Sequence, residues 1–184
     1  SGLSSPKPRR GRIRRMHGSK PTDLPPSDHL VVLAPDPAGY AALSRIVTRG
    51  QVRGEQDRTV YDLGELAEAS RLGHLVAVSG CWHGAVPRAA AAGDLAGALA
   101  AAAQLREVVP DRLYVELWHH AMPEDDVRND VLAEVAAKLR LPTVATNNVH
   151  YADRRDADLS EVLAAIGGRR DLDTADGFRP ATDE

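Results

Sequence analysis

Residues 112–146, RLYVELWHHAMPEDDVRNDVLAEVAAKLRLPTVAT, decide the predicted fold. The apolar run RLYVELW at 112–118 is typical of a buried strand, and PTVAT at 142–146 is typical of another. The segment between them, 125–139, follows Pro123 and has the spacing of an amphipathic helix. Its expected apolar face consists of Val127, Val131, Val135 and Leu139. A strand, a helix and a second strand in this order predict two parallel strands.

Two further apolar runs, HLVVLA at 29–34 and LVAVSG at 75–80, predict two more strands earlier in the chain. Each run is continuous rather than alternating, which is typical of parallel strands buried on both faces. Strands that alternate with helices predict the α/β class, as an open sheet or as part of a barrel. In either arrangement, the carboxyl ends of the strands and the loops after them form the functional rim.

Helical spacing also appears outside the opening unit. Residues 37–49 predict an amphipathic helix, and residues 156–167 predict a last helix before a polar tail. The Ala-rich stretch at 86–109 should form two helical pieces. We expect the break near Gly93, with Asp94 as the N-cap of the second piece.

Composition indicates a soluble globular protein of 184 residues, with 43% hydrophobic and 27% charged residues. The net charge of −3 gives no overall attraction to nucleic acid. No apolar run reaches the about 20 residues of a membrane span, and the basic N-terminus lacks the apolar region of a signal peptide. One cysteine, Cys81, excludes an internal disulfide. We therefore expect a cytoplasmic location.

The first 27 residues are rich in Pro, Gly, Ser and Arg, and we expect them to form a flexible basic loop or arm. A solvated loop is the favoured interpretation, and a nucleic-acid-binding arm is the alternative. Seven cations in it could contact phosphate: Lys7, Arg9, Arg10, Arg12, Arg14, Arg15 and Lys20.

Several side chains near the predicted strand ends could bind metal. Asn148 and His150 stand two residues apart after the last strand, so an extended chain would direct both side chains to one face. Cys81 follows a strand and His29 begins one. Imidazole and thiolate suit zinc, and imidazole with carboxylate suits manganese. Each residue also has a structural interpretation, as do the other candidate histidines, His83, His119 and His120, and the carboxylate Glu116.

Four stretches together resemble one family. They are HLVVLAPDPAGYAALSRIV, SGCWHGAVPRAAAAGD, YVELWHHAMPEDDVRND and AAKLRLPTVATNNVHYADRRDAD. They are similar to the polymerase-and-histidinol-phosphatase (PHP) domain of bacterial DNA polymerase III alpha subunits. TNNVHYA, VRND and LDTADGF resemble the error-prone, ImuC-type branch. The resemblance covers residues 28 to about 178.

The resemblance implies part of a distorted (β/α)7 PHP-type barrel with mostly parallel strands and a metal cleft at one end. His29, Cys81 and His150 match ligand positions of active relatives. Asn148 stands where those relatives carry a metal-binding aspartate, and an amide offers only a neutral carbonyl oxygen. We therefore expect a degenerate cleft that binds zinc or manganese weakly or not at all, with no catalytic residue.

The resemblance also implies an organisation and a function. We expect an arm at 1–27, a PHP core at 28–170 that is incomplete at its N-terminal side, and a connector at 171–184 toward a polymerase palm. The predicted function is the mainly structural PHP part of an error-prone polymerase that copies damaged DNA, inactive when isolated. Implied partners are DNA, the palm and thumb of the same chain, an ImuB-type protein and the sliding clamp. The magnesium of the polymerase would bind outside this sequence. The alternatives are a metal-dependent phosphoesterase or 3'-5' exonuclease, and a nucleic-acid-binding module that uses the arm.

Overall fold

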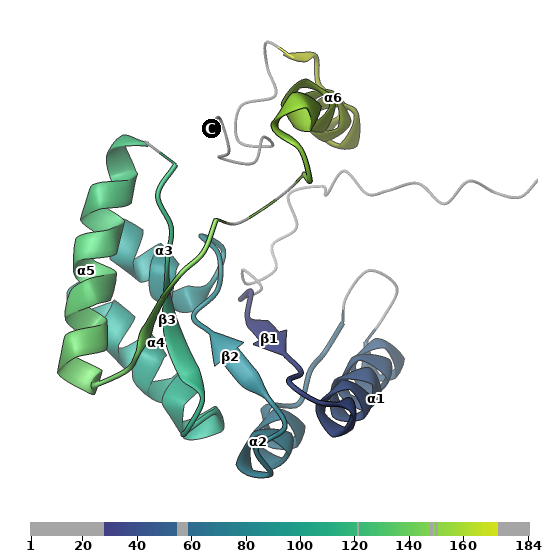
Figure 1. The fold of residues 1–184 in the computed structure, drawn as a ribbon, viewed down its shortest axis with the longest axis vertical. Coiled ribbons are helices and arrows are strands. Elements are labelled where there is room, and N and C mark those ends of the chain that lie inside the picture. Colours follow the sequence, from purple (N-terminus) through teal and green to yellow (C-terminus); the bar gives the residue numbers. More distant parts are fainter. Residues whose placement is uncertain (1–27, 55–58, 121, 148, 150, 173–184) are drawn as a thin grey trace, which may run out of the picture. The chain divides into compact units, whose positions relative to one another are not determined.

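The computed structural model describes residues 28–54, 59–120, 122–147, 149 and 151–172, and Figure 1 shows their helices and strands. The chain divides into two units. The described part of the larger unit ends at Val149, and that of the smaller unit begins at Tyr151. Among the described helices, none combines the length and the apolar character that crossing a bilayer requires.

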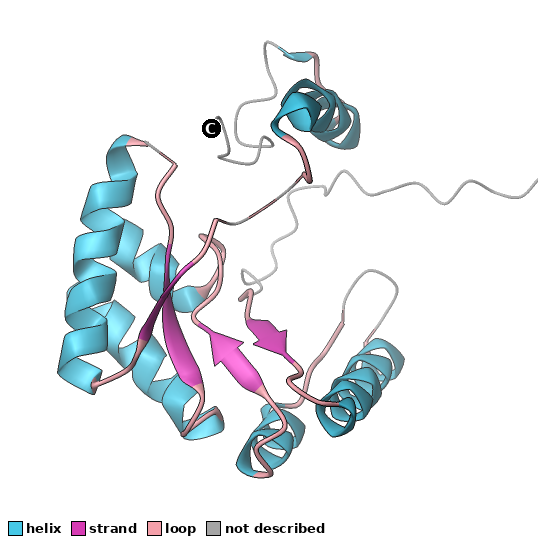
Figure 2. Cartoon of the chain, in the orientation of Figure 1, coloured by secondary structure: helices cyan, strands magenta, loops and turns pink. Residues whose placement is uncertain are grey.

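The larger unit contains a four-stranded sheet in the order β1-β2-β3-β4 (Figure 2). The strands are β1 (Val31–Leu33), β2 (Val76–Val78), β3 (Leu113–Leu117) and β4 (Thr143–Ala145). β2, β3 and β4 are parallel, which confirms the α/β class and the mostly parallel sheet. β1 is antiparallel to β2, so this strand departs from the parallel arrangement that its continuous apolar run indicated.

Contacts between the end of β1 and the start of β2 explain the antiparallel pair. Helix α1 (Pro37–Arg53) packs against α2 (Leu63–Arg71), and together they return the chain to the end of β1. Asp36, just after β1, lies 3.1 Å from Nδ1 of His74, just before β2. The two ends are therefore adjacent, and β2 must run back along β1. The sequence had not predicted α2.

The sheet is also less buried than its continuous apolar runs predicted. Val31 and Leu33 of β1 are 40% and 53% exposed, so this strand is not buried on both faces. β1 and β4 are the edge strands, and three residues each is a short edge, a common device against edge-to-edge association.

The Ala-rich stretch forms two helices, α3 (Ala85–Ala91) and α4 (Leu95–Val108). The predicted break is confirmed, because Gly93 has a φ of +70° and Asp94 caps α4. The Asp94 carboxylate accepts a hydrogen bond of 2.9 Å from the Gly97 N–H, which satisfies one of the unpaired donors of the first turn.

Helix α5 (Pro123–Leu139) packs with α3 and α4 over one side of the sheet (Figure 1). Its core contacts come from Leu132, Val135 and Ala136 against Val115 of β3. The expected apolar face is wrong at its N-terminal end, where Val127 is 51% exposed. The ionic side chains Asp125 and Arg128 are buried instead. They bind the loop after β3, and this fixes the rotation of the helix.

The smaller unit holds a 3₁₀ turn (Arg154–Asp156) and helix α6 (Ala157–Gly168). The predicted last helix is thereby confirmed within one residue at each end. α6 ends in a left-handed residue, Arg169, whose N–H reaches the Ala165 and Ile166 carbonyls.

Candidate functional site

His29 and Cys81, two predicted metal positions, lie together at one corner of the sheet. Cys81 follows the carboxyl end of β2, and His29 precedes the amino end of β1. Because β1 and β2 are antiparallel, these two ends adjoin, and Cys81 Sγ lies 3.5 Å from His29 Nδ1. The sequence placed Cys81 on the rim, but it could not place His29 there without the strand direction.

His83 lies beside the same pair. Its ring centroid is 5.0 Å from that of His29 and 5.2 Å from that of Trp82, and its carbonyl accepts the His29 N–H at 3.4 Å. Partial desolvation lowers the pKa of His83, and its interactions with His29 and Arg88 lower it further. A neutral imidazole is the form that can donate a lone pair to a metal.

Two glycines allow the β2–α3 loop to approach His29 closely. Gly80 has a φ of +92°, and a Cβ placed there would lie 2.7 Å from the His29 carbonyl oxygen. A Cβ on Gly84 would lie 2.9 Å from the same oxygen. A side chain at either position would collide with this backbone. The glycines therefore bring the Cys81 backbone against the strand that follows His29.

The other predicted ligand positions, Asn148 and His150, lie outside the described residues. In the described part of the chain, no group of three or more His, Cys, Asp and Glu side chains is placed to hold an ion. The adjacent imidazole and thiol of His29 and Cys81 fit zinc in ligand type. A tetrahedral zinc site needs four ligands, so two more would be required.

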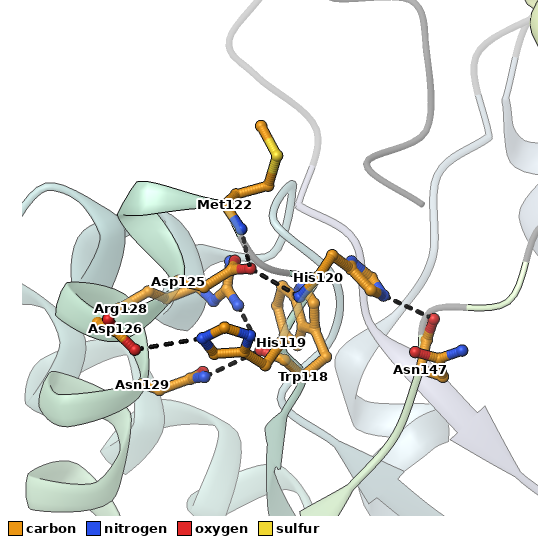
Figure 3. Close-up of polar contacts among 9 residues, drawn as sticks. All are labelled: Trp118, His119, His120, Met122, Asp125, Asp126, Arg128, Asn129 and Asn147. Atoms are coloured by element: carbon orange, nitrogen blue, oxygen red, sulfur yellow. Dashed lines mark hydrogen bonds and ion pairs between the residues drawn. The ribbon is translucent and has the colours of Figure 1, made fainter. Parts of the chain in front are cut away.

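A second polar cluster lies where β3 ends, between the loop after β3 and the N-terminal part of α5 (Figure 3). The Asp125 carboxylate accepts hydrogen bonds from the backbone N–H of His120 at 2.7 Å and of Met122 at 3.1 Å. It also forms an ion pair of 2.6 Å with Arg128. Burial raises the pKa of Asp125, but these three partners lower it more, and the net pKa is below the ordinary value.

Arg128 and Asn129 bind the first carbonyl after β3. Arg128 Nη2 and Asn129 Nδ2 both donate to the Trp118 carbonyl, at 2.6 and 2.9 Å. The Arg128 guanidinium also covers the Trp118 ring, with 4.0 Å between the guanidinium carbon and the ring centroid. Arg128 is thus buried with its charge paired and its guanidinium over an aromatic face, which offsets part of the cost of burying the charge.

The neighbouring histidines His119 and His120 point in different directions (Figure 3). His119 Nε2 lies 3.2 Å from Asp126 on the exposed side of α5. His120 is 5% exposed, and its Nε2 lies 2.9 Å from the Asn147 carbonyl oxygen after β4. A carbonyl only accepts, so Nε2 carries the proton. Both histidines therefore have structural partners, which supports the structural interpretation for them.

Glu116, on β3, also connects this strand to the chain after β4. Its Oε1 accepts a hydrogen bond of 2.7 Å from the Thr146 hydroxyl, and it is 8% exposed. This agrees with the structural interpretation of Glu116. No site role was predicted for Asp125, Arg128 or Asn129, although Arg128 and Asn129 belong to the VRND motif. The available signal was Pro123 followed by three acids, which marks a helix start but not a buried ion pair.

An open hollow of about 440 Å³ lies elsewhere, between α1 and α2. Its floor is apolar, with Ala42, Ile46 and Ala69, and Arg45 and Glu65 stand at its rim. None of the predicted site residues lines it.

Comparison with known proteins connects this geometry to a family. A family model described as "PHP domain" matches residues 10–120, which include the His29–Cys81 corner and end at His120.

Relatives extend the similarity over most of the chain. The "Error-prone DNA polymerase" of Cutibacterium acnes is 40% identical over 162 residues, which are 85% of this chain and 14% of that protein. The protein of the same name from Mycobacterium tuberculosis (strain H37Rv) is 40% identical over 156 residues, 84% of this chain and 14% of that one. "DNA polymerase III subunit alpha" of Thermus aquaticus is 35% identical over 156 residues, which are 85% of this chain and 13% of that protein. The chain thus spans about a seventh of the length of these relatives.

Proposed function

Because the chain belongs to the PHP-domain family, we propose that it is the PHP part of an error-prone DNA polymerase of the DNA polymerase III alpha type. The supporting observation is the 40% identity to relatives named "Error-prone DNA polymerase" over 84–85% of the chain. The whole protein would act on DNA, past lesions, in the cytoplasm. The palm and thumb, an ImuB-type protein and the sliding clamp would be its partners.

We further propose that the sheet belongs to a distorted (β/α)7 barrel. The parallel strands β2, β3 and β4, linked by helices that pack on one side, are the repeating unit of such a barrel. The half-exposed β1 residues Val31 and Leu33 would then face other parts of the barrel.

The role proposed for this domain is mainly structural, with a degenerate metal cleft. His29, Cys81 and His150 would hold zinc or manganese weakly, with Asn148 as a poor fourth ligand. The adjacent His29 and Cys81 side chains support this placement of the cleft. A metal would supply Lewis acidity there, but a neutral amide in place of a carboxylate reduces the attraction for a cation. The magnesium ions of nucleotidyl transfer would bind elsewhere in the whole protein.

Comparing the isolated chain with the full-length protein tests this function. We expect the full-length protein to extend a primer across a lesion. We expect the isolated chain neither to extend it nor to release nucleotides or phosphate with manganese. Metal-dependent release by the isolated chain would instead support the phosphoesterase or exonuclease alternative. DNA affinity that falls steeply with salt and disappears on deletion of residues 1–22 would support the binding-arm alternative.

A substitution tests the degenerate cleft. Asn148→Asp in the full-length protein restores a carboxylate, so we expect it to increase zinc or manganese content measured by elemental analysis. Asn147→Asp, one residue earlier, is the matched control and should leave the content unchanged. Equal metal content in the wild type and Asn148→Asp would show that the amide does not limit binding.

A further inference from the structure

The short strand β4 needs support beyond its last residue. It is a three-residue edge strand, and Thr143 and Ala145 are exposed. After Ala145 the chain is held by a backbone hydrogen bond of 2.9 Å from the Thr146 N–H to the Leu117 carbonyl. In the sequence, Asn147 is followed by Asn148, the first predicted ligand position after β4.

Two buried side chains from the β3 side bind the residues that follow β4. Glu116 accepts the Thr146 hydroxyl hydrogen bond at 2.7 Å. His120 donates from Nε2 to the Asn147 carbonyl at 2.9 Å (Figure 3). Glu116 and His120 are themselves buried, at 8% and 5% exposure, whereas Thr146 is half-buried and Asn147 is exposed. Two consecutive residues are therefore held by two separate side-chain contacts.

His120 is itself held in place by α5. Its backbone N–H donates to Asp125, and the ion pair between Asp125 and Arg128 is buried. Arg128 also binds the Trp118 carbonyl two residues before His120. These contacts hold the backbone of residues 118–120, and the His120 ring extends from this fixed backbone to Asn147. Such a chain of hydrogen bonds, with buried partners, specifies one arrangement of the backbone.

We propose that His120 and Glu116 are positioning residues that fix the backbone of residues 146–147, the two residues that precede the predicted ligand position Asn148. The identity of the positioned cleft rests on the proposed function. The positioning of residues 146–147 does not, since it follows from the hydrogen bonds that Glu116 and His120 make. Neither residue needs to touch a metal or a substrate for this role.

Hydrogen–deuterium exchange of the full chain, read on peptides that cover residues 143–151, tests the proposal. His120→Leu removes the donor, so we expect the amides after Ala145 to exchange about threefold to tenfold faster, the range that the loss of one hydrogen bond implies. His120→Gln keeps an N–H donor on a side chain of similar reach and should restore much of the protection. His119→Leu changes the neighbouring histidine, which points toward Asp126, and should match the wild type.

A second variant covers the case in which His120→Leu does not fold. Thr146→Val keeps the side-chain shape but loses the hydroxyl that Glu116 accepts, and it should raise exchange in the same peptides. Faster exchange after Ala145, with unchanged peptides from α3 and α4, supports the proposal. Equal exchange in His120→Leu and His119→Leu, or an equal rise throughout the chain, would overturn it. Because the measurement needs neither metal nor DNA, a failure here is distinct from a failure of the proposed function.

Discussion

Two corners of the same sheet carry histidines, but they use them differently. At the β1–β2 corner, His29 and His83 are exposed and Cys81 is half-buried. At the β3–β4 corner, Glu116, His120 and Asp125 are buried, and each makes a hydrogen bond to a neighbouring segment. Burial and hydrogen bonding, rather than residue type, thus separate side chains that remain available for a ligand from those that hold the fold.

The backbone explains the contrast. The β2–α3 loop approaches His29 through Gly80 and Gly84, so the packing there is done by the main chain and the side chains stay near the surface. The loop after β3 instead meets the first turn of α5, whose Asp125 and Arg128 enter the interior to bind its backbone groups. One corner is therefore stabilised by close backbone contact, and the other by buried side-chain charge.

The largest expected effect is the removal of Arg128. Arg128→Met leaves the Asp125 carboxylate buried without its cation, which should lower the free energy of unfolding by about 3–5 kcal/mol. Arg88→Met is the matched control at the other corner. It breaks the exposed ion pair with Asp28 and should cost about 0–1 kcal/mol. Urea denaturation of both variants measures the difference, and similar losses would remove the distinction between the corners.

The buried pair also shows what sequence patterns can and cannot predict. The break at Gly93 and the Asp94 cap were predictable, because a glycine followed by a capping side chain acts within a few residues. The apolar face of α5 was assigned by periodicity, which counts Val127 as core and Asp125 as surface. In the structure Val127 is exposed and Asp125 is buried, because the backbone N–H of His120 in the loop before the helix donates to the Asp125 carboxylate. A pattern within the helix does not contain this partner.

The site was predictable in part for a similar reason. The end of LVAVSG placed Cys81 on the rim, since the rule for strand ends needs only the strand itself. Its contact with His29 depends on the direction of β1, which depends on α2, a helix that the sequence did not reveal. The contact between His29 and Cys81 therefore follows from the pairing of β1 with β2, which no local sequence pattern indicates. The prediction for Asn148 and His150 stays a prediction, outside the described residues.

The second effect concerns the backbone at the open corner. Gly80→Ala adds a Cβ to a residue with a φ of +92° and places it 2.7 Å from the His29 carbonyl oxygen, so we expect a cost of about 1–3 kcal/mol. Gly73→Ala is the control, since its φ of +78° is comparable but no atom lies within 4 Å of its Cβ position. Gly73→Ala should cost only the conformational strain, about 1 kcal/mol. Equal midpoints in thermal denaturation would mean that the approach to His29 contributes nothing.

The third effect appears only in acid. The pKa of Asp125 is lower in the folded protein than in the unfolded chain, where it is about 3.9. Its contribution to stability is therefore complete above that value and is lost as the pH falls through the folded pKa. Between pH 5 and pH 2, Asp125→Asn should lose stability less steeply than the wild type. Urea denaturation across this pH range measures the slope, and an equal slope for Asp125→Asn and the wild type would contradict the prediction.

The smallest change in stability should come from Cys81. A small change is expected if the β1–β2 corner, unlike the β3–β4 corner, does not hold the fold through its side chains. A half-buried thiol that contacts an exposed imidazole contributes little to folding, so Cys81→Ala should change the free energy of unfolding by about 0.5 kcal/mol or less in the presence of a chelator. The same variant should lose any stabilisation that zinc gives the wild type, because ligand binding to the folded state adds directly to stability. A loss in chelator as large as that of Arg128→Met would make the β1–β2 corner a structural element like the other. The exposure of its side chains would then no longer indicate a place for a ligand.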